Sequence, residues 1–252
     1  MHYRSWSFTH VGTVRDHNED ALVDRPEIGL FGVADGAGGH DSGEVASALL
    51  RENLQAIPAG LGPAEMVGRV RRAITDAHAA LLDEARRRGP GTVIASTIVV
   101  LLLHGDHFAC LWAGDSRLYL FGDGRLQQLS RDHSLVQEMV DAGILRPEDA
   151  EGHPRANIIT RAVGANDEPL EVDKVTGHVQ PGDRFLLCSD GLFKALAETA
   201  VAEVLADPAP GGSPAERLIE AALARRASDN VTAVVVEALA APDGGPDPGP
   251  DT

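Results

Sequence analysis

Short apolar runs in the middle of the chain are separated by segments that leave no room for a helix between them. These segments are Gly105-Asp106, Gly114-Asp115 and Gly122-Asp123-Gly124, which are typical of tight hairpin turns. Because a parallel connection needs a dozen or more residues, links this short force the neighbouring runs to pair antiparallel. The pattern therefore predicts β-hairpins that join residues 93–103, 108–112, 117–121 and 126–129.

Segments with the apolar spacing of helices lie on both sides of these strands. We expect helices over residues 42–56, 63–88, 135–142, 199–205 and 214–224, and further strands over residues 28–34, 171–177, 184–188 and 231–238. Strands at both ends and in the centre, with two helix groups between them, indicate the α+β class. In such a fold, antiparallel sheets are covered by helices.

The length of 252 residues suits one large domain, or at most two. We predict a single domain over residues 1–240. Residues 241–252 are almost entirely Pro, Gly and Asp, and this composition predicts a disordered tail. A polar, turn-rich stretch at about residues 134–160 is predicted to form a flap between strands.

The chain is strongly acidic, with a formal net charge of −16. Such a field repels nucleic-acid backbones and anionic membranes, so neither is an expected partner, and a phosphate-handling site would need local cations. The longest apolar run, residues 93–103, is too short to span a bilayer, and the N-terminus lacks the apolar core of a signal peptide. We therefore expect a cytoplasmic protein.

Three aspartates stand where a hydrophobic strand meets a tight break. Asp35 and Asp190 each close a strand and precede a glycine, and Asp229 comes just before the apolar run 231–236. A carboxylate delivered to the middle of a domain needs a partner, and a divalent metal with hard oxygen ligands could serve all three. Singly, each has an ordinary alternative: a Gly-rich turn for Asp35, a helix N-cap for Asp190 and a turn for Asp229.

Other candidates surround these aspartates in the sequence. Gly36 lets the backbone approach a ligand and frees its carbonyl as a metal ligand. The charged segment 15–20 offers Arg15 for a phosphate and the carboxylates of Glu19 and Asp20 for a metal, with an exposed loop as the alternative. Asp115 falls at a predicted hairpin turn, where turn chemistry alone could explain it.

Several other catalytic patterns are missing from the sequence. No two of the ten histidines have the i, i+4 spacing of a zincin, so each is expected to be a supporting or surface residue. The chain has no phosphate-binding loop of the Gly-x-x-x-x-Gly-Lys-Ser/Thr type and no Gly-x-Ser-x-Gly elbow. A nucleotide site of the first type and a serine hydrolase of the second type are therefore unsupported.

Six motifs occur in an order that is more specific than any one of them. The sequence in this respect resembles the metal-dependent protein phosphatases, the type 2C serine/threonine phosphatase family, and in particular its compact bacterial members. The resemblance covers about residues 8–238. The motifs are Arg15…Asn18-Glu19-Asp20, Val33-Ala34-Asp35-Gly36-Ala37-Gly38-Gly39-His40, Gly114-Asp115-Ser116-Arg117, Ile159-Thr160-Arg161-Ala162-Val163-Gly164, Cys188-Ser189-Asp190-Gly191-Leu192 and Asp229-Asn230-Val231-Thr232.

The resemblance implies a four-layer α-β-β-α sandwich, in which two packed antiparallel sheets are flanked by helix pairs, with the metals at one end. It implies that Asp35 bridges two Mn²⁺ or Mg²⁺ ions, and that Asp190 and Asp229 bind one of the two. Glu19 and the Gly36 carbonyl would serve the second ion, Asp115 a weaker third ion, and Arg15 the substrate phosphate. The residues expected to support these ligands are Asp20, His40 and Asn230.

The implied chemistry is direct hydrolysis of a phosphoserine or phosphothreonine ester. Two metals about 3.5–4 Å apart can lower the pKa of a bridging water and aim it at phosphorus, with Arg15 orienting the phosphoryl oxygens. The position of the His that many eukaryotic members carry after the Asp-Gly pair is Ala37 here. We therefore assign no general acid.

The expected partners are phosphorylated proteins, including a serine/threonine kinase or its substrates, and we expect a monomer. The sequence also resembles phosphatases that are paired with a kinase in type VI secretion clusters. The resemblance lies in residues 153–155, the motif at 159–164, and Phe193-Lys194. Three alternatives remain open. They are a non-catalytic regulator of the same fold, a phosphatase acting on an anti-sigma-factor antagonist, and a metal-free small-ligand binding protein.

Overall fold

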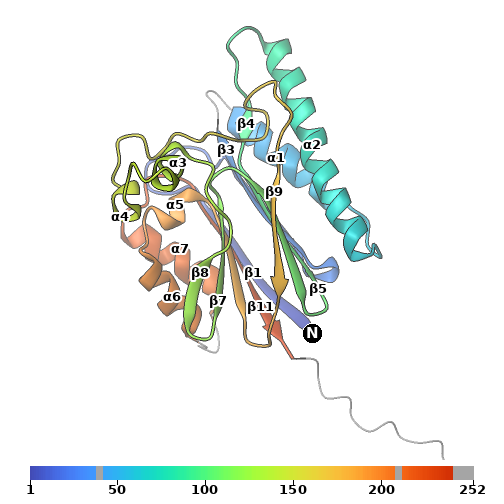
Figure 1. Ribbon diagram of the computed structural model, residues 1–252, viewed down its shortest axis with the longest axis vertical. Helices are drawn as coiled ribbons and strands as arrows, with labels where there is room; N and C mark the ends of the chain where they lie inside the picture. Colours follow the sequence, from blue (N-terminus) through green and yellow to red (C-terminus); the bar gives the residue numbers. More distant parts are fainter. Residues whose placement is uncertain (38–41, 208–211, 241–252) are drawn as a thin grey trace, which may run out of the picture.

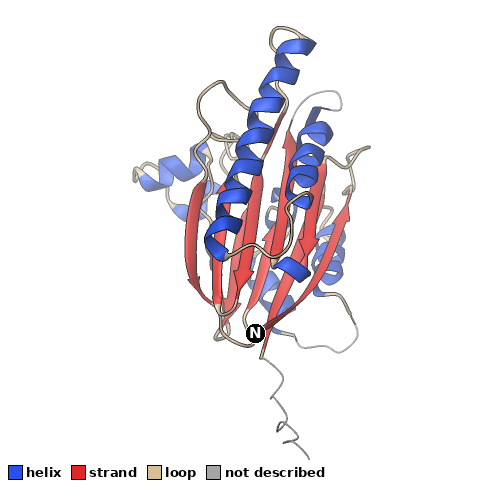
Figure 2. Ribbon diagram, turned by 90° about the vertical axis from the view of Figure 1, so that its right-hand side faces the viewer, coloured by secondary structure: helices blue, strands red, loops and turns tan. Residues whose placement is uncertain are grey.

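Two antiparallel β-sheets pack face to face, and helices cover the outer face of each (Figures 1 and 2). The structure is a computed structural model that describes residues 1–37, 42–207 and 212–240. One sheet has the strand order β1-β11-β10-β7-β8, and the other has the order β2-β3-β5-β6-β9, with the short β4 paired to β3. The predicted α+β class and the four-layer sandwich are confirmed.

The strands are β1 (His2–His10), β2 (Asp20–Arg25), β3 (Leu30–Ala37), β4 (Ala95–Ser96), β5 (Ile98–His104), β6 (His107–Ala113), β7 (Arg117–Gly122), β8 (Arg125–Gln128), β9 (Asp173–His178), β10 (Arg184–Cys188) and β11 (Val231–Leu239). The helices are α1 (Ser42–Gln55), α2 (Pro63–Arg88), α3 (Leu135–Asp141), α4 (Pro147–Ala150), α5 (Asp190–Phe193), α6 (Glu198–Ala206) and α7 (Pro214–Ala224), with a 3₁₀ turn at Pro26–Ile28.

Alternating side chains of each strand serve two different apolar layers. On β3, Phe31 and Val33 point into the layer between the sheets, whereas Leu30 and Ala34 pack against α1 and α2. Both faces of the inner strands are therefore covered. Each fully buried large side chain of this kind contributes roughly 1.5–3 kcal/mol to the free energy of folding. The sheets are thus a stiff platform for whatever stands at their ends.

The helix pattern in the sequence is reproduced closely. Helix α2 begins at Pro63, where the ring suits the first turn, and ends at Arg88, so that its last turn carries three arginines. The four-residue helices α4 and α5 were not predicted, because they are too short to show a hydrophobic period. None of the helices within the described parts of the chain is both long and apolar enough to cross a membrane.

One predicted hairpin is wrong. Strands β6 and β7 do not pair: β6 lies between β5 and β9 in one sheet, and β7 lies between β10 and β8 in the other. The segment 114–116 therefore carries the chain from one sheet to the other. Gly114 makes this corner with φ +119°, and a side chain there would collide with Thr97, because an added Cβ would lie 2.5 Å from its Cβ. The short link forbids a parallel crossover, but it does not require a hairpin.

Residues 135–158 leave the sandwich and return to nearly the same place. The amide of Leu135 donates to the Ile158 carbonyl at 2.9 Å, and the amide of Thr160 donates to the His133 carbonyl at 2.9 Å. Helices α3 and α4 lie within this excursion, at one end of the sandwich (Figure 1). His40 and the tail 241–252 lie outside the described residues.

Candidate metal centre

Acidic side chains from both sheets lie close enough for their charges to act on Asp35. The strand β3 that carries Asp35 ends at the upper end of the sandwich in Figure 1. Asp35 lies near the end of β3, directly opposite Asp20 on β2, while Asp190 follows β10 and Asp229 precedes β11. The pKa of Asp35 is raised well above its ordinary value, first by burial and then by the charges of Asp20, Asp190, Asp115 and Asp229. The strand ends therefore bring together the three aspartates that the sequence singled out.

The backbone of Asp35 is held in place from β4 and the start of β5. Its carbonyl accepts hydrogen bonds from the Thr97 amide at 2.8 Å and from Ser96 Oγ at 2.9 Å. Its amide donates to Thr97 Oγ1 at 3.1 Å, and that hydroxyl lies 2.7 Å from Ser116 Oγ. The backbone of Asp35 is thus held through both its amide and its carbonyl, and Ser116 links Thr97 to the crossover that carries Asp115.

Asp20 is more central than its predicted supporting role suggested. One carboxylate oxygen, Oδ2, accepts from Ser189 Oγ at 2.7 Å and from Thr232 Oγ1 at 2.6 Å, whereas the buried Oδ1 has no hydrogen-bond partner among the described residues. Burial is the main reason why the pKa of Asp20 rises to about 7; the charges of Asp190 and Asp229 contribute to the rise, and the two hydrogen bonds oppose it. An unpartnered buried carboxylate oxygen is costly, and a cation would satisfy it.

Asp190 is the first residue of the short helix α5, and Lys194 one turn later forms an ion pair with it. Burial lowers the pKa of Lys194, but the charges of Asp190, Asp115 and Asp35 outweigh that effect, and the net shift is upward. The ammonium group therefore stands among three carboxylates. Gly191 permits the approach of α5 to the segment before β11, because an added Cβ would lie 2.0 Å from the Asn230 carbonyl oxygen.

Asp229 accepts a hydrogen bond from Arg15 Nη2 at 2.9 Å, and its other oxygen caps the Asn230 amide at 2.9 Å. The Arg15 side chain remains 54% exposed, so most of its donors face solvent at the rim of the acidic cluster. Gly12 lets the loop that carries Arg15 approach Asp229: it has φ +84°, and an added Cβ would lie 2.1 Å from the Asp229 carbonyl oxygen. Arg15 is thus an exposed cation at the edge of this site, and its contact with a phosphate stays a prediction.

Asn230 fixes the loop that carries Arg15 and Glu19. Its Oδ1 accepts from the Glu19 amide, and its Nδ2 donates to the carbonyls of Val11 and His17, at 2.8, 2.9 and 2.9 Å. The predicted supporting role of Asn230 in this loop has a clear geometric basis. The Glu19 carboxylate lies against Gly43, where an added Cβ would come within 2.7 Å of Glu19 Oε1 and 2.8 Å of the Gly36 carbonyl carbon. Glu19 and the Gly36 carbonyl are therefore neighbours.

Asp115 is 4% exposed, and its buried Oδ1 has no hydrogen-bond partner in the part of the chain that the structure describes. Its pKa rises to about 7, first because of burial and then because of the charges of Asp190 and Asp132, while Lys194 opposes the rise. Asp115 lies near the aspartate cluster because the segment 114–116 joins the two sheets and does not form a hairpin turn. Beside it lies a cleft of about 250 Å³ whose lining includes Asp115, Phe193 and Lys194 on one side and Val136, Gln137 and Asn157 of the 135–158 excursion on the other.

These side chains suit divalent ions with oxygen ligands. Two buried carboxylate oxygens have no hydrogen-bond partner among the described residues, and three carboxyl groups have raised pKa values, first because they are buried and then because other carboxylates lie near them. Cations would relieve both costs. Among the described residues, no three of these carboxylates bring their oxygens within 4.8 Å of one another. Asp190 is paired with Lys194 and Asp229 with Arg15, so an ion bound by either aspartate would compete with that side chain.

Sequence reasoning missed the residues that hold the carboxylates. Ser189 and Thr232 stand inside motifs that the sequence identified, but nothing there shows that their hydroxyls converge on one aspartate. Lys194 could have been noticed as a cation at i+4 from Asp190 on a helix. The pairing of Ser96 and Thr97 with Asp35 depends on the register of β3 and β4, and no local pattern reports it.

Comparison with known proteins decides the family. The model of the family described as protein phosphatase 2C matches residues 11–225. The chain belongs to this family of metal-dependent serine/threonine phosphatases. The chain is 34% identical over 228 residues to the serine/threonine protein phosphatase PstP of Mycobacterium tuberculosis, a match that covers 90% of this chain and 43% of PstP. The chain thus spans less than half of the length of that relative.

Two solved structures extend the similarity over nearly the whole fold. One is PppA, described as a key regulatory component of the type VI secretion system in Pseudomonas aeruginosa, with 44% identity, a TM-score of 0.87 and coverage of 95% of this chain and 99% of PppA. The other is the catalytic domain of PstP in complex with two manganese ions, with 33% identity, a TM-score of 0.80 and coverage of 94% and 99%. The predicted family is thereby confirmed, and one of the similar structures, PstP, holds two manganese ions.

Proposed function

We propose that this protein removes phosphate from phosphoserine and phosphothreonine in other proteins, with two Mn²⁺ or Mg²⁺ ions at the aspartate cluster. The observation that carries the proposal is the convergence of Asp20, Asp35, Asp115, Asp190 and Asp229, with two unpartnered buried oxygens among them. Family membership supports the same activity. The metal-free ligand-binding alternative does not account for these mutually repelling carboxylates.

The resemblance to the family implies the ligand roles, and the positions of the residues support them. Asp35 would contact both ions, because it has carboxylates from both sheets around it; Asp190 and Asp229 would hold one ion, and Glu19 and the Gly36 carbonyl the other. Asp115, across the cluster beside Asp190, would hold a weaker third ion. When bound, such ions lower the pKa of water and neutralise negative charge on a phosphoryl group.

The chain's own groups bind and orient the substrate. Arg15 is exposed at the rim and can turn its guanidinium from Asp229 to two phosphoryl oxygens. The cleft between Asp115 and the 135–158 excursion would take residues that flank the phosphorylated side chain, and residues 134–160 would act as the flap over it. Ala37 cannot donate a proton, so no side chain is assigned as general acid.

The physiological setting is part of the proposal. We infer a single catalytic domain over residues 1–240, a monomeric cytoplasmic protein, and phosphoprotein partners that include a serine/threonine kinase or its substrates. The similarity to PppA, a regulator of type VI secretion, supports the subtype that pairs a phosphatase with such a kinase. Co-purification of a kinase encoded next to this gene, and its dephosphorylation, would test that pairing.

The activity is tested with Asp35→Ala and Asp229→Ala, assayed on p-nitrophenyl phosphate with Mn²⁺ and on matched phosphothreonine and phosphotyrosine peptides. Each variant is expected to lose at least about 10³-fold in kcat/KM, because losing a catalytic ion removes several kcal/mol of transition-state stabilisation. Asp76→Ala, which removes an exposed aspartate from α2, is the control and should match the parent protein. Near-parental turnover by either site variant in a folded protein would sink the assignment.

A further inference from the structure

A second group of possible metal ligands lies at the opposite end of the same sheet. In the pairing of β3 with β5, Asp35 lies beyond Val33 and its partner Val99, whereas Leu30 pairs with Leu102 at the other end. The turn after β5 extends this second end, and Asp106 and His107 lie on it. His178 is the last residue of β9 and lies directly opposite His107 on β6. The group is therefore separated from the aspartate cluster by the length of the strands.

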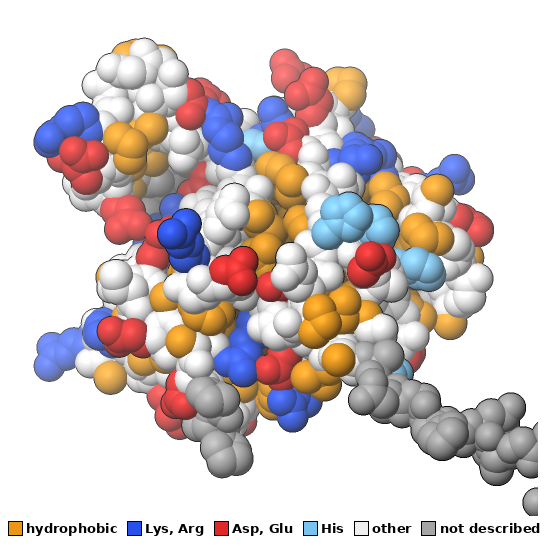
Figure 3. Space-filling model, turned by 60° about the horizontal axis from the view of Figure 1, so that its bottom comes forward, with side chains coloured by type: hydrophobic (Ala, Val, Ile, Leu, Met, Phe, Trp, Pro, Cys, Tyr) orange, Lys and Arg blue, Asp and Glu red, His pale blue; other side chains and the backbone are white. Residues whose placement is uncertain are grey.

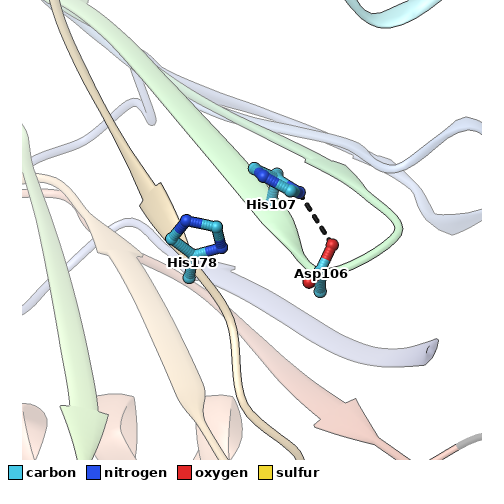
Figure 4. Close-up of side chains that lie close together, drawn as sticks. All are labelled: Asp106, His107 and His178. Carbon is cyan, nitrogen blue, oxygen red and sulfur yellow. Dashed lines mark ion pairs between the residues drawn. The ribbon is translucent and has the colours of Figure 1, made fainter.

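The three side chains already lie close to one another (Figure 4). His107 Nδ1 is 2.7 Å from Asp106 Oδ1, and the rings of His107 and His178 have centroids 4.4 Å apart at an angle of 50°. One ligand atom from each residue lies within 4.8 Å of the other two, a spacing that no other His, Cys, Asp or Glu trio reaches among the described residues. All three side chains are exposed, so they lie close together without being packed in a core.

This geometry is near what a tetrahedral ion demands. Bonds of about 2.0–2.1 Å to nitrogen or oxygen place neighbouring ligand atoms about 3.3 Å apart. The side chains of His107 and Asp106 are 63% and 66% exposed, so both can rotate by the small amount required without repacking a core. The two backbone positions that matter most, His107 and His178, are fixed by the register of β6 and β9.

The ligand types select the class of metal. Two imidazoles and one carboxylate suit zinc and neighbouring first-row transition ions, whereas Mg²⁺ prefers oxygen ligands alone. Figure 3 shows this end of the molecule, where histidine and acidic side chains gather on an open surface. The site therefore differs in chemistry from the all-oxygen cluster at the other end.

The contacts among Asp106, His107 and His178 contribute too little to stability to account for the grouping of these side chains. An exposed ion pair such as that of Asp106 and His107 contributes only about 0–1 kcal/mol to stability. Two imidazoles that meet at an angle of 50° at the surface add little beyond ordinary contact. A bound ion, in contrast, would tie the β5–β6 turn to the end of β9 and use all three groups.

We propose that Asp106, His107 and His178 form a second metal site, which binds a zinc-class divalent transition ion with its remaining coordination open to solvent. The proposal does not depend on the phosphatase assignment, because none of the three residues lies near the aspartate cluster. The ion would cross-link two neighbouring strands and raise the thermal stability of the sheet at that end.

The test uses the untagged full-length chain in excess Mg²⁺, which occupies oxygen sites and competes poorly for imidazole. Zn²⁺ is then titrated by calorimetry and by competition with a chromophoric chelator, and X-ray absorption reports the ligands. We expect one Zn²⁺ per chain with two imidazole ligands, and at least about a tenfold loss of affinity in His107→Gln, His178→Gln and Asp106→Asn. Phosphatase activity with Mn²⁺ should be unchanged in all three.

Two controls separate this site from other Zn²⁺ binding. His153→Gln removes a half-exposed histidine elsewhere and should bind Zn²⁺ like the parent protein. Asp35→Asn, altered at the aspartate cluster, should also keep the Zn²⁺ equivalent. Parental affinity in His107→Gln and His178→Gln would overturn the proposal. So would loss of the Zn²⁺ equivalent in Asp35→Asn, or an absorption spectrum without imidazole.

Discussion

Asp20 and Asp35 lie directly opposite each other on β2 and β3, and the carboxyl groups of both have raised pKa values. Burial is the largest cause for each, and neighbouring carboxylates add to it. Two buried acids on adjacent strands thus destabilise the folded, metal-free protein when both are ionised, and bound cations would remove this destabilisation.

The first prediction concerns the pH dependence of the metal-free protein. The folded-state pKa of Asp20 is about 7, above its ordinary value, so the folded protein holds a proton that the unfolded chain releases above about pH 4. The stabilisation is complete below the unfolded pKa and is lost as pH rises through about 7. Urea unfolding in chelator should therefore show a falling free energy of unfolding from about pH 5 to pH 8.

Asp20→Asn keeps the shape of the side chain and cannot ionise, so its stability should depend less on pH over the same range. Saturating Mn²⁺ should reverse the trend in the parent protein, because ions bind the ionised carboxylates and release protons. A metal-free protein whose stability rises steadily from pH 5 to pH 8 would contradict the origin of these pKa shifts.

The second prediction concerns Lys194, whose ammonium group is paired with Asp190. Lys194→Met keeps much of the aliphatic length and removes a charge that competes with metal ions for the cluster. We expect the Mn²⁺ concentration for half-maximal activity to fall about fivefold, which corresponds to about 1 kcal/mol for a partly exposed charge. The chain has only one other lysine, Lys174, which is exposed on β9, so Lys174→Met is a matched control for the change in net charge. An unchanged or higher Mn²⁺ requirement in Lys194→Met would show that the ammonium does not compete.

Much of the fold could be predicted because the signals were local. The bounds of α2, α7 and β10 follow from periodicity, prolines and strand-forming residues, and the ordered motifs pointed to the family. The partition of strands between the sheets could not be predicted. The link at 114–116 reads as a hairpin in sequence, and only the packing of β6 against β5 and β9 shows that it joins two sheets.

The sequence was enough to predict the candidate metal ligands, but not the residues that form hydrogen bonds to them. Asp35, Asp190 and Asp229 stand out because a carboxylate at a strand end is unusual. Asp20 did not stand out from its charged loop, because its hydroxyl partners come from residues 169 and 212 positions away. Long-range hydrogen bonds of this kind leave no trace in a local pattern. The trio at Asp106 was missed for the same reason, since His178 joins it only through strand register.

The third prediction concerns Arg15. Arg15→Ala should raise KM for p-nitrophenyl phosphate, and the inhibition constant of inorganic phosphate, by about tenfold or more, because a charge-assisted contact to the phosphoryl oxygens is lost. Arg15→Lys should have values of both constants between those of the parent protein and Arg15→Ala, since lysine keeps the charge and loses the bidentate geometry. Arg125→Ala, on the exposed side of edge strand β8, serves as the control. If phosphate inhibits Arg15→Ala as strongly as the parent protein, the guanidinium does not bind substrate.

The fourth prediction concerns Asn230, which is 6% exposed and makes three hydrogen bonds to the loop that carries Arg15 and Glu19. Asn230→Ala leaves one amide and two carbonyls of that loop without a partner, so we expect a loss of about 2–3 kcal/mol in the free energy of unfolding. Because the loop positions Glu19, the Mn²⁺ requirement should also rise. Urea unfolding and a Mn²⁺ titration of activity measure the two effects.

Asn53→Ala is the matched control for this change, because the Asn53 side chain joins α1 to α2 through one hydrogen bond to the Ala73 carbonyl at 3.2 Å. It should cost about 1 kcal/mol and leave the Mn²⁺ requirement unchanged, since it lies away from the loop. Loss of stability without any change in Mn²⁺ requirement in Asn230→Ala would mean that the loop keeps its place without the amide. In that case, the contacts of Glu19 with Gly36 and Gly43 would be sufficient to position the carboxylate.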